Sequence, residues 1–221
     1  MQEELIRRNF LQIQEEIAPY SLNIIAVTKY FDERAMEAAY KAGLRNFGES
    51  RAVEAVEKIR QLPDEVRNNS KFHFIGHLQT NKVKKVVGVF DLIHSVDSLK
   101  LAEVISDEAL KYGKVQDILL QLNNAGEEQK FGYSKEALFE DFPKITALKG
   151  VNVKGIMNIA PLGVDEKTLE TLFTNVVSVR DELQNKFGCE LKDISMGMSQ
   201  DYKIAAHCGS TMLRIGRKLF Q

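Results

Sequence analysis

The residues best suited to chemistry in this sequence are one lysine near the N-terminus and two polar segments near the C-terminus. Lys29 follows the apolar run IIAV and Thr28. A lysine at the end of a buried strand is partly removed from water, which favours the neutral amine that attacks an aldehyde to form a Schiff base. Lysines at strand ends are also commonly solvated, so position alone does not define a site.

The two C-terminal segments are candidates for binding an anion. One reads SMGMSQD (residues 195–201) and the other reads RIGR (residues 214–217). If both follow strands of a parallel barrel, Ser199 offers a hydroxyl, and Gly216 lets the backbone approach closely enough for the N–H groups of Gly216 and Arg217 to bind phosphate. An ordinary turn at a strand end is the alternative interpretation of Gly216.

Arg214 belongs to the apolar segment MLRIG, where alternation directs it to the same face as Met212 and Gly216. A guanidinium is always charged and only donates hydrogen bonds, so a pyridine nitrogen in contact with it must stay unprotonated. The alternative is a buried ion pair with a carboxylate such as that of Glu49.

Eight short apolar segments alternate with helical patterns and must position these residues. The expected strands span 24–27, 45–48, 71–76, 91–96, 115–123, 151–159, 193–197 and 212–216, and the expected helices span 32–42, 51–61, 81–87, 98–111, 135–147, 165–186 and 201–207. An amphipathic helix with Leu5, Ile6, Phe10, Ile13 and Ile17 on one face precedes them and ends before Pro19.

Strands that alternate with helices pair in parallel, and eight such units close a barrel that carries its functional residues at the carboxyl ends of the strands. The sequence therefore predicts the α/β class, as one (β/α)8 TIM-type barrel over residues 1–221 with an extra N-terminal helix.

Composition limits the partners and the location. The 221 residues include 30 Lys and Arg against 31 Asp and Glu, so no strong field would attract nucleic acid or an anionic membrane. No apolar run is long enough to span a bilayer, and the charged N-terminus lacks a signal region. Cys189 and Cys208 have no metal-ligand spacing and suit a reducing compartment. We expect a cytoplasmic protein without a metal site.

The segments IIAVTK, NFGES, FHFIGHLQTNK, SMGMSQD and GSTMLRIG resemble motifs of the pyridoxal phosphate homeostasis protein family. That family resembles the N-terminal barrel of alanine racemases, and the match covers nearly the whole chain. The resemblance implies pyridoxal 5′-phosphate (PLP) as the cofactor, a Schiff base on Lys29 and contact of Arg214 with the pyridine nitrogen. The cofactor-binding residues that it implies are Lys29, Asn46, Met157, Ser199, Arg214, Gly216 and Arg217.

Several other polar residues have weaker assignments. Ser50 stands where many relatives have asparagine, which makes it a doubtful ligand. We interpret Ser210 and Thr211 as the end of a helix and the start of a strand, too far from Arg214 for phosphate contact. We interpret His73, His94 and His207 as structural. His77, Gln79, Asn81 and Lys82 are candidates either for the pocket or for the start of a helix. The segment that contains Lys130 is either a mobile lid over the mouth or an ordinary solvated loop.

The sequence lacks part of what PLP catalysis needs. By the resemblance, racemases take a second base from a tyrosine in an additional domain, for which this chain has no room. We therefore expect a non-catalytic, monomeric PLP-binding protein that can serve PLP-dependent apoenzymes. The alternatives are a small amino-acid racemase that uses Lys29 with Tyr30 or Tyr133, and a Schiff-base aldolase without a cofactor.

Overall fold

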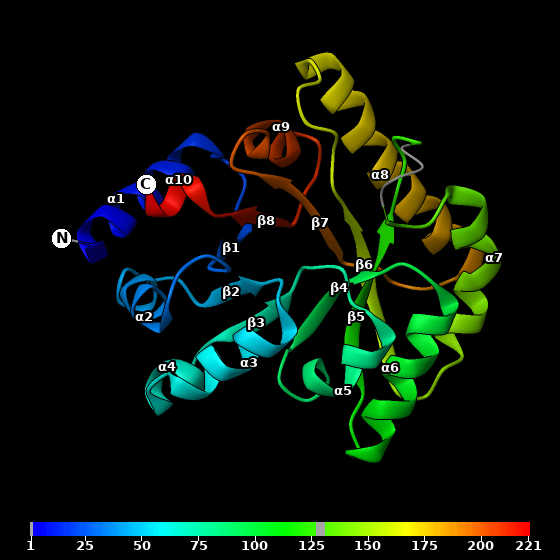
Figure 1. The fold of residues 1–221 in the computed structure, drawn as a ribbon. Coiled ribbons are helices and arrows are strands. Elements are labelled where there is room, and N and C mark those ends of the chain that lie inside the picture. The colour runs from blue at the N-terminus through cyan, green and yellow to red at the C-terminus, as the bar shows by residue number, and fades with distance from the viewer. Residues whose placement is uncertain (1, 127–130) are drawn as a thin grey trace.

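A closed barrel of eight parallel strands forms the centre of the computed structural model, which describes residues 2–126 and 131–221 (Figure 1). Neighbouring strands pair in sequence order, and β1 pairs with β8 to close the barrel, with Asn23 opposite Met212. The predicted (β/α)8 TIM-type barrel is thus confirmed. The strands are β1 Asn23–Val27, β2 Asn46–Glu49, β3 Lys71–Phe74, β4 Leu92–Val96, β5 Gln116–Leu122, β6 Val151–Asn158, β7 Asp193–Met198 and β8 Met212–Ile215.

Helices surround the barrel, and several begin where a short polar side chain can cap the first turn. Asp32, Ser98, Ser134 and Asp165 each accept a hydrogen bond from the backbone N–H three residues later. The helices are α1 Gln2–Glu16, α2 Glu33–Lys41, α3 Ala52–Gln61, α4 Asp64–Asn68, η1 Thr80–Lys82, α5 Val83–Val86, α6 Leu99–Lys111, α7 Lys135–Thr146, α8 Glu166–Phe187, α9 Tyr202–His207 and α10 Arg217–Phe220.

Three differences from the expected helices are local. The sequence pattern did not predict α4 or α10, which have five and four residues and are too short to show helical periodicity. The helix expected over 81–87 begins instead as the 3-10 turn η1 and continues as the short α5. None of these differences changes the order of the strands.

Alternation along the strands separates two layers of the core. Outward side chains such as Phe47, Ile118 and Ile194 are buried against the helices. Inward side chains fill the barrel, where an apolar cluster consists of Ile25, Leu92, Leu119, Met157 and Met212. The barrel interior also holds polar side chains, which belong to the site described below.

Helix α1 joins the two ends of the chain. It packs on α10, beside which it lies in Figure 1, and its Ile6 and Ile13 are fully buried. Asn9 Nδ2 donates to the carbonyl of Leu219 at 3.1 Å, and Glu16 accepts a hydrogen bond from the hydroxyl of Tyr202 on α9. The N-terminal helix is therefore an integral part of the barrel.

No helix within the described ranges is both long and apolar enough to cross a membrane. Cys189 and Cys208 are free thiols, and partial burial raises the pKa of each.

Candidate functional site

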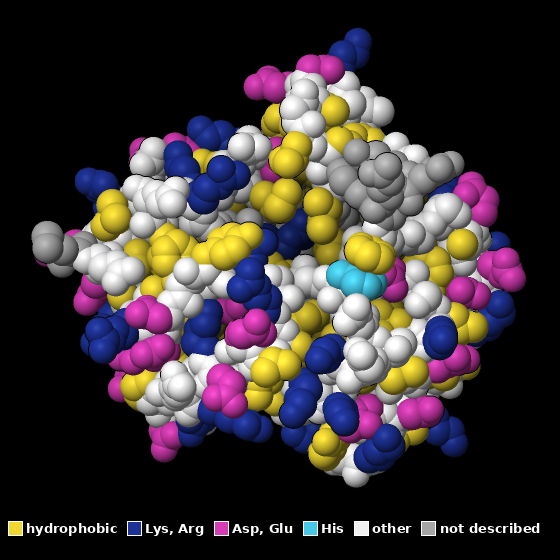
Figure 2. Space-filling view, in the orientation of Figure 1, with side chains coloured by type: hydrophobic (Ala, Val, Ile, Leu, Met, Phe, Trp, Pro, Cys, Tyr) yellow, Lys and Arg dark blue, Asp and Glu magenta, His cyan; other side chains and the backbone are white. Residues whose placement is uncertain are grey.

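A cavity of about 890 Å³ opens at the carboxyl ends of the strands. This volume lies within the range of small-molecule pockets. Figure 2 shows a hollow at the centre of this face, with basic side chains in and beside it and hydrophobic side chains along its rim. The predicted residues that line the cavity are Lys29, Ser199, Arg214, Gly216 and Arg217. Residues from both ends of the sequence thus meet at one mouth.

Lys29 reaches the cavity because it continues the inward face of β1. Ile25 is in the interior cluster, and Val27 and Lys29 line the cavity at successive steps of two residues. The lysine itself lies just beyond the strand, is half-buried, and places Nζ 5.0 Å from the centre of the Tyr30 ring.

The backbone before Lys29 is held by a buried ion pair. Lys58 Nζ donates to the carbonyl of Thr28 at 2.8 Å and contacts Glu49 Oε1 at 2.6 Å. Thr28 Oγ1 donates to the same Glu49 oxygen at 2.8 Å. We call Thr28, Glu49 and Lys58 the Thr28 clasp. Glu49 pairs with Lys58 and Thr28 and not with Arg214, so the alternative prediction of an ion pair between Glu49 and Arg214 is wrong.

Arg214 is buried in the barrel and faces the cavity with part of its guanidinium. Only 4% of its surface is exposed. Nη1 donates to Ser195 Oγ at 2.6 Å and Nη2 donates to the carbonyl of Asn158 at 2.8 Å. Burial lowers the pKa of Arg214 to about 10, and the carboxylate of Asp201 opposes this shift. The side chain therefore stays positively charged near neutral pH.

The two predicted phosphate segments converge beside Arg214. Gly197 has φ of +90°, and a Cβ there would lie 2.5 Å from the Cβ of Ala205, so this turn requires glycine. Beyond it, Asp201 Oδ1 accepts from the N–H of Met198 at 2.5 Å, while Ser199 Oγ accepts from the N–H of Lys218 at 3.4 Å. These contacts bring the loop after β7 against the start of α10.

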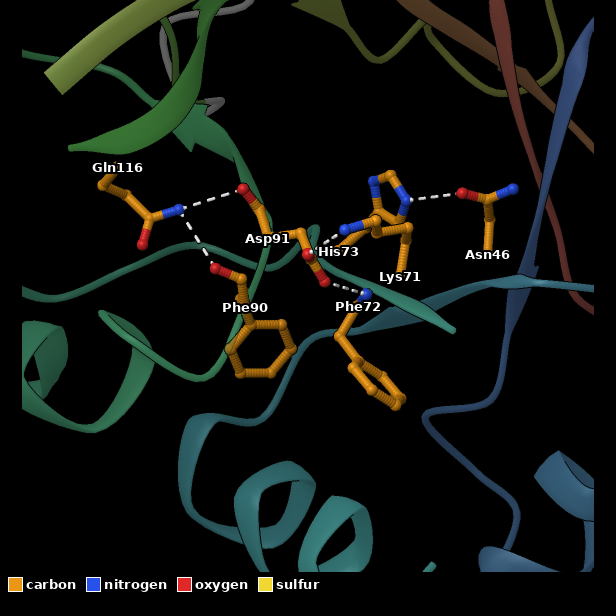
Figure 3. A network of polar contacts seen from close by, with 7 residues as sticks. All are labelled: Asn46, Lys71, Phe72, His73, Phe90, Asp91 and Gln116. Carbon is orange, nitrogen blue, oxygen red and sulfur yellow. Dashed lines mark hydrogen bonds and ion pairs between the residues drawn. The ribbon is translucent and has the colours of Figure 1, made fainter. Parts of the chain in front are cut away.

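A chain of polar side chains continues from Arg214 across the barrel interior. Ser195 Oγ lies 2.9 Å from His94 Nδ1, His94 Nε2 lies 3.0 Å from His73 Nδ1, and His73 Nε2 lies 3.1 Å from Asn46 Oδ1. Figure 3 shows the last of these contacts, with the His73 ring and the Asn46 amide facing each other from β3 and β2. We call these five side chains the interior relay.

Burial keeps both histidines of the interior relay neutral. It lowers the pKa of His73 to about 4 and the pKa of His94 well below its ordinary value of 6.5. The neighbouring charge of Arg214 lowers the pKa of His94 further. The structural interpretation of both histidines fits these satisfied, buried positions.

At the amino ends of the strands, polar contacts fix the segment from which β3 and β4 start. Lys71 Nζ donates to Asp91 Oδ1 at 2.9 Å, and the N–H of Phe72 donates to Asp91 Oδ2 at 2.8 Å (Figure 3). Gln116 Nε2 donates to the carbonyl of Phe90 at 3.1 Å. These contacts join the starts of β3 and β5 to the residues that precede β4.

Two predicted site residues are not part of the cavity lining. Met157 is fully buried in the interior cluster, and Ile159, two residues later on β6, lines the cavity instead. Asn46 lies at the start of β2, and Ser50 lines the cavity four residues later. Neither side chain lines the cavity, and a direct contact of either one with a cofactor stays a prediction.

The cavity is also lined by polar residues without a firm assignment from the sequence, among them Asp201 and His77. Asp201 lies directly before α9, and its negative charge acts on Arg214. A buried arginine needs a group that balances its positive charge, but the sequence did not show which carboxylate lies nearby. His77, which the sequence left open, lines the cavity, contacts Asp97 at 3.3 Å and stacks on Phe131 with ring centres 3.5 Å apart.

The remaining candidates lie outside the cavity lining. Ser210 Oγ donates to the carbonyl of Met196 at 2.8 Å and Thr211 Oγ1 accepts from the N–H of Ile194 at 2.8 Å, which confirms their structural interpretation. His207 forms a hydrogen bond with Tyr20 at 3.1 Å. The prediction for Lys130 falls outside the described residues.

The site combines three chemical groups in one cavity: a lysine amine, an arginine that can only donate, and two loops that present a hydroxyl and backbone N–H groups. Apolar side chains of Val27, Ile75 and Ile159 lie among them. Such a set suits a phosphorylated aromatic aldehyde.

Comparisons with known proteins agree with this geometry. The family model described as "Alanine racemase, N-terminal domain" matches residues 2–221. A pyridoxal phosphate homeostasis protein of Synechocystis sp. is 39% identical over 202 residues, which cover 91% of this chain and 92% of the relative. A protein of the same name from Schizosaccharomyces pombe is 32% identical over 212 residues, covering 95% of this chain and 87% of the relative.

A solved structure extends the likeness to the whole fold. PipY of Synechococcus elongatus with PLP bound superposes with a TM-score of 0.88 and 34% identity, covering 98% of this chain and 100% of the PipY chain. The chain therefore belongs to the alanine racemase N-terminal domain family and, within it, to the pyridoxal phosphate homeostasis proteins.

Proposed function

We propose that this protein binds PLP in the cavity through a Schiff base on Lys29 and takes part in PLP homeostasis without catalysing a reaction of its own. The convergence of Lys29, Arg214 and the two loops on one cavity carries the proposal. The names of the curated relatives and the PLP-bound structure of PipY support it.

The residues present fit the three ends of this cofactor. PLP supplies an aldehyde, a pyridine nitrogen and a phosphate. In the proposal Lys29 binds the aldehyde carbon, and Arg214 donates to the unprotonated pyridine nitrogen. Ser199 and the N–H groups of Gly216 and Arg217 hold the phosphate, and the N–H of Arg217 has no acceptor within the described chain.

The tyrosines decide how well the racemase alternative is supported. Tyr133 is buried and does not line the cavity, and burial raises its pKa, so the phenolate that would act as a base is scarcely populated near neutral pH. Tyr30 lines the cavity, but its side chain is 74% exposed at the rim. The curated relatives are named for homeostasis and not for an enzyme activity. These observations favour a PLP-holding protein over a racemase or an aldolase.

The proposal is tested by trapping the Schiff base. Purified protein mixed with PLP is reduced with borohydride, digested and analysed by mass spectrometry. We expect a pyridoxyl group on Lys29 and its loss in Lys29→Arg, which keeps the positive charge. Lys114→Arg, at a surface lysine remote from the cavity, is the matched control. A protein that forms no adduct on Lys29 would contradict the proposal.

Catalysis is tested separately on the PLP-loaded protein. Exchange of the α-hydrogen of amino acids with deuterated water should proceed no faster than with free PLP. Exchange well above that rate, lost in Tyr30→Phe, would favour the racemase alternative.

The finer aspects of the function also belong to this proposal. We place the protein in the cytoplasm, where free thiols such as Cys189 and Cys208 persist, and as a monomer that passes PLP to apoenzymes. Tyr30, Phe131 and Leu162 are exposed large apolar side chains on segments at the mouth. If delivery is direct, an apoenzyme should regain activity faster from the loaded protein than the release rate of PLP into solution allows.

A further inference from the structure

The interior relay connects strands on opposite sides of the barrel to Arg214, which faces the cavity from the barrel interior. Its members come from β2, β3, β4, β7 and β8, and only Arg214 lines the cavity. His94 and Ser195 are fully buried, with 0% exposure each. The proposed function assigns no role to Asn46, His73, His94 and Ser195 in this chain of contacts.

The hydrogen bonds of the interior relay are all satisfied when each side chain donates to the next one, from Arg214 to Asn46. Arg214 can only donate, so Ser195 Oγ accepts from it at 2.6 Å. The Ser195 hydroxyl proton is then free for His94 Nδ1 at 2.9 Å. A neutral imidazole has one donor and one acceptor nitrogen, so His94 Nε2 donates to His73 Nδ1, and His73 Nε2 donates to Asn46 Oδ1. In this direction, each of the four hydrogen bonds that link the relay has one donor and one acceptor.

The opposite direction leaves a proton unsatisfied. If the Asn46 amide were turned, both histidines would donate toward Ser195, whose oxygen would then accept from His94 and Arg214 together. The hydroxyl proton of Ser195 would have no acceptor within the described residues, at a position without exposure to water. Buried donors without acceptors are rare and costly, so the chain runs from Arg214 to Asn46.

The relay and one carbonyl hold both ends of the guanidinium. Ser195 Oγ accepts from Nη1 and the carbonyl of Asn158 accepts from Nη2, so the plane of the group is fixed by two acceptors. Among the described residues, Asp201 acts on Arg214 through its charge, without a hydrogen bond to the guanidinium. Without Ser195 Oγ, one anchor is left, and the guanidinium can rotate about it.

We propose that Ser195 and His94 are positioning residues that orient Arg214 toward the pyridine nitrogen of PLP, with His73 and Asn46 keeping His94 in the tautomer that accepts from Ser195. This inference rests on the proposed contact of Arg214 with the cofactor ring. The relay acts on the cofactor only through Arg214, so its effect is on the electronic state of the ring and on retention of the cofactor, and not on the bond to Lys29.

Paired substitutions at two relay positions test the inference on the PLP-loaded protein. Ser195→Ala removes the hydroxyl that anchors Arg214, and His94→Leu removes the acceptor of that hydroxyl. For both variants we expect a changed absorbance spectrum of bound PLP and about tenfold faster release of PLP. In His94→Asn, the amide oxygen can replace Nδ1 as acceptor, so the spectrum and release rate should stay near those of the unmodified protein. His207→Asn, on the surface at α9, is the matched control.

The outcomes separate this inference from the proposed function. Arg214→Glu should change the spectrum because a carboxylate lets the ring nitrogen take up a proton. If it does so while Ser195→Ala and His94→Leu match the unmodified protein, the relay inference is wrong and the proposed function stands. An unchanged spectrum in folded Arg214→Glu overturns the ring contact and the relay inference together, whereas failure to trap PLP on Lys29 overturns the proposed function.

A measurement on the unsubstituted protein does not depend on how the variants fold. Nitrogen NMR of labelled imidazoles distinguishes the two neutral tautomers. We expect His73 and His94 both to carry their proton on Nε2 at neutral pH. A His94 that carries its proton on Nδ1 cannot accept from Ser195 and would overturn the inference.

Discussion

At the scale of single residues, the site depends on two buried cations with different surroundings. Arg214 is held by neutral acceptors, with Asp201 contributing only through its charge. Lys58 is paired directly with Glu49, whose side chain is 2% exposed. Removing one partner of a buried pair leaves an uncompensated charge away from water, which costs far more than loss of a surface pair.

This difference predicts the result of breaking the Thr28 clasp. Lys58→Met should lower the free energy of unfolding by ~3–5 kcal/mol because it leaves Glu49 buried without its cation. It should also slow borohydride trapping on Lys29, since the backbone at Thr28 loses a hydrogen bond. Urea denaturation and the rate of adduct formation measure the two effects.

The matched control is an exposed pair. Lys71, whose side chain is 67% exposed, contacts Asp91 at 2.9 Å. Lys71→Met should change the stability by about 0–1 kcal/mol and leave trapping unchanged. If both substitutions cost the same, the clasp has no special role.

At the scale of elements, β3 and β4 place two neutral histidines in the barrel, and this makes the stability depend on pH. In the unfolded chain both rings titrate near pH 6.5. In the fold, burial lowers the pKa of His73 to about 4 and that of His94 well below 6.5. Between these values the unfolded chain binds more protons, so stability decreases as the pH falls from about 6.5 toward 4.

Each histidine should contribute ~1.4 kcal/mol per pH unit within this window. In His94→Asn, one of the two titrating rings is absent, so the dependence of the unfolding free energy on pH should become shallower by that amount. Other groups that titrate in the same range contribute equally to the slopes of His94→Asn and of the unmodified protein, so they do not affect the difference between the two slopes. Urea denaturation at pH 4.5, 5.5 and 6.5 measures the slope, and equal slopes for both proteins would contradict the assignment.

The strands and helices were also the part of the structure that the sequence predicted best. The apolar run at 24–27 marked β1 to within one residue, because a buried parallel strand needs continuous apolar residues. The rule that barrel sites lie at carboxyl ends of strands then located Lys29 and the loops after β7 and β8. The short α10 was not predictable, since four residues contain barely one turn.

The interior relay was beyond sequence reasoning for a geometric reason. His94 and Ser195 are 101 positions apart, and their contact depends on the register of every strand between β4 and β7. The same limit explains why Glu49 was considered for Arg214 and Asp201 was not. Residue type predicts that a buried arginine needs acceptors, whereas only the folded barrel decides which ones lie within reach.

At the scale of the whole molecule, the cavity joins the two ends of the chain. Lys29 follows β1, and Gly216 and Arg217 follow β8, the strand that closes the barrel against β1. Helix α1 packs on α10 directly behind this closure. A ligand that contacts both segments therefore opposes opening of the barrel at the pairing of its first and last strands.

We accordingly expect PLP to stabilise the entire fold. At a free concentration of about 100 times its Kd, PLP should raise the free energy of unfolding by ~2.7 kcal/mol. Pyridoxal, which lacks the phosphate, should give much less at the same concentration. Thermal or urea unfolding followed by circular dichroism tests this, and equal effects of both compounds would argue against phosphate binding by the loops after β7 and β8.

The Thr28 clasp has a further consequence, for rates of reaction. By fixing the backbone next to Lys29, it limits where the amine can lie relative to the loops after β7 and β8. A ligand seated on those loops then meets the amine at an effective molarity far above any concentration of free lysine in solution. Covalent capture should therefore be fast compared with arrival of the ligand, and loading should be limited by diffusion into the mouth.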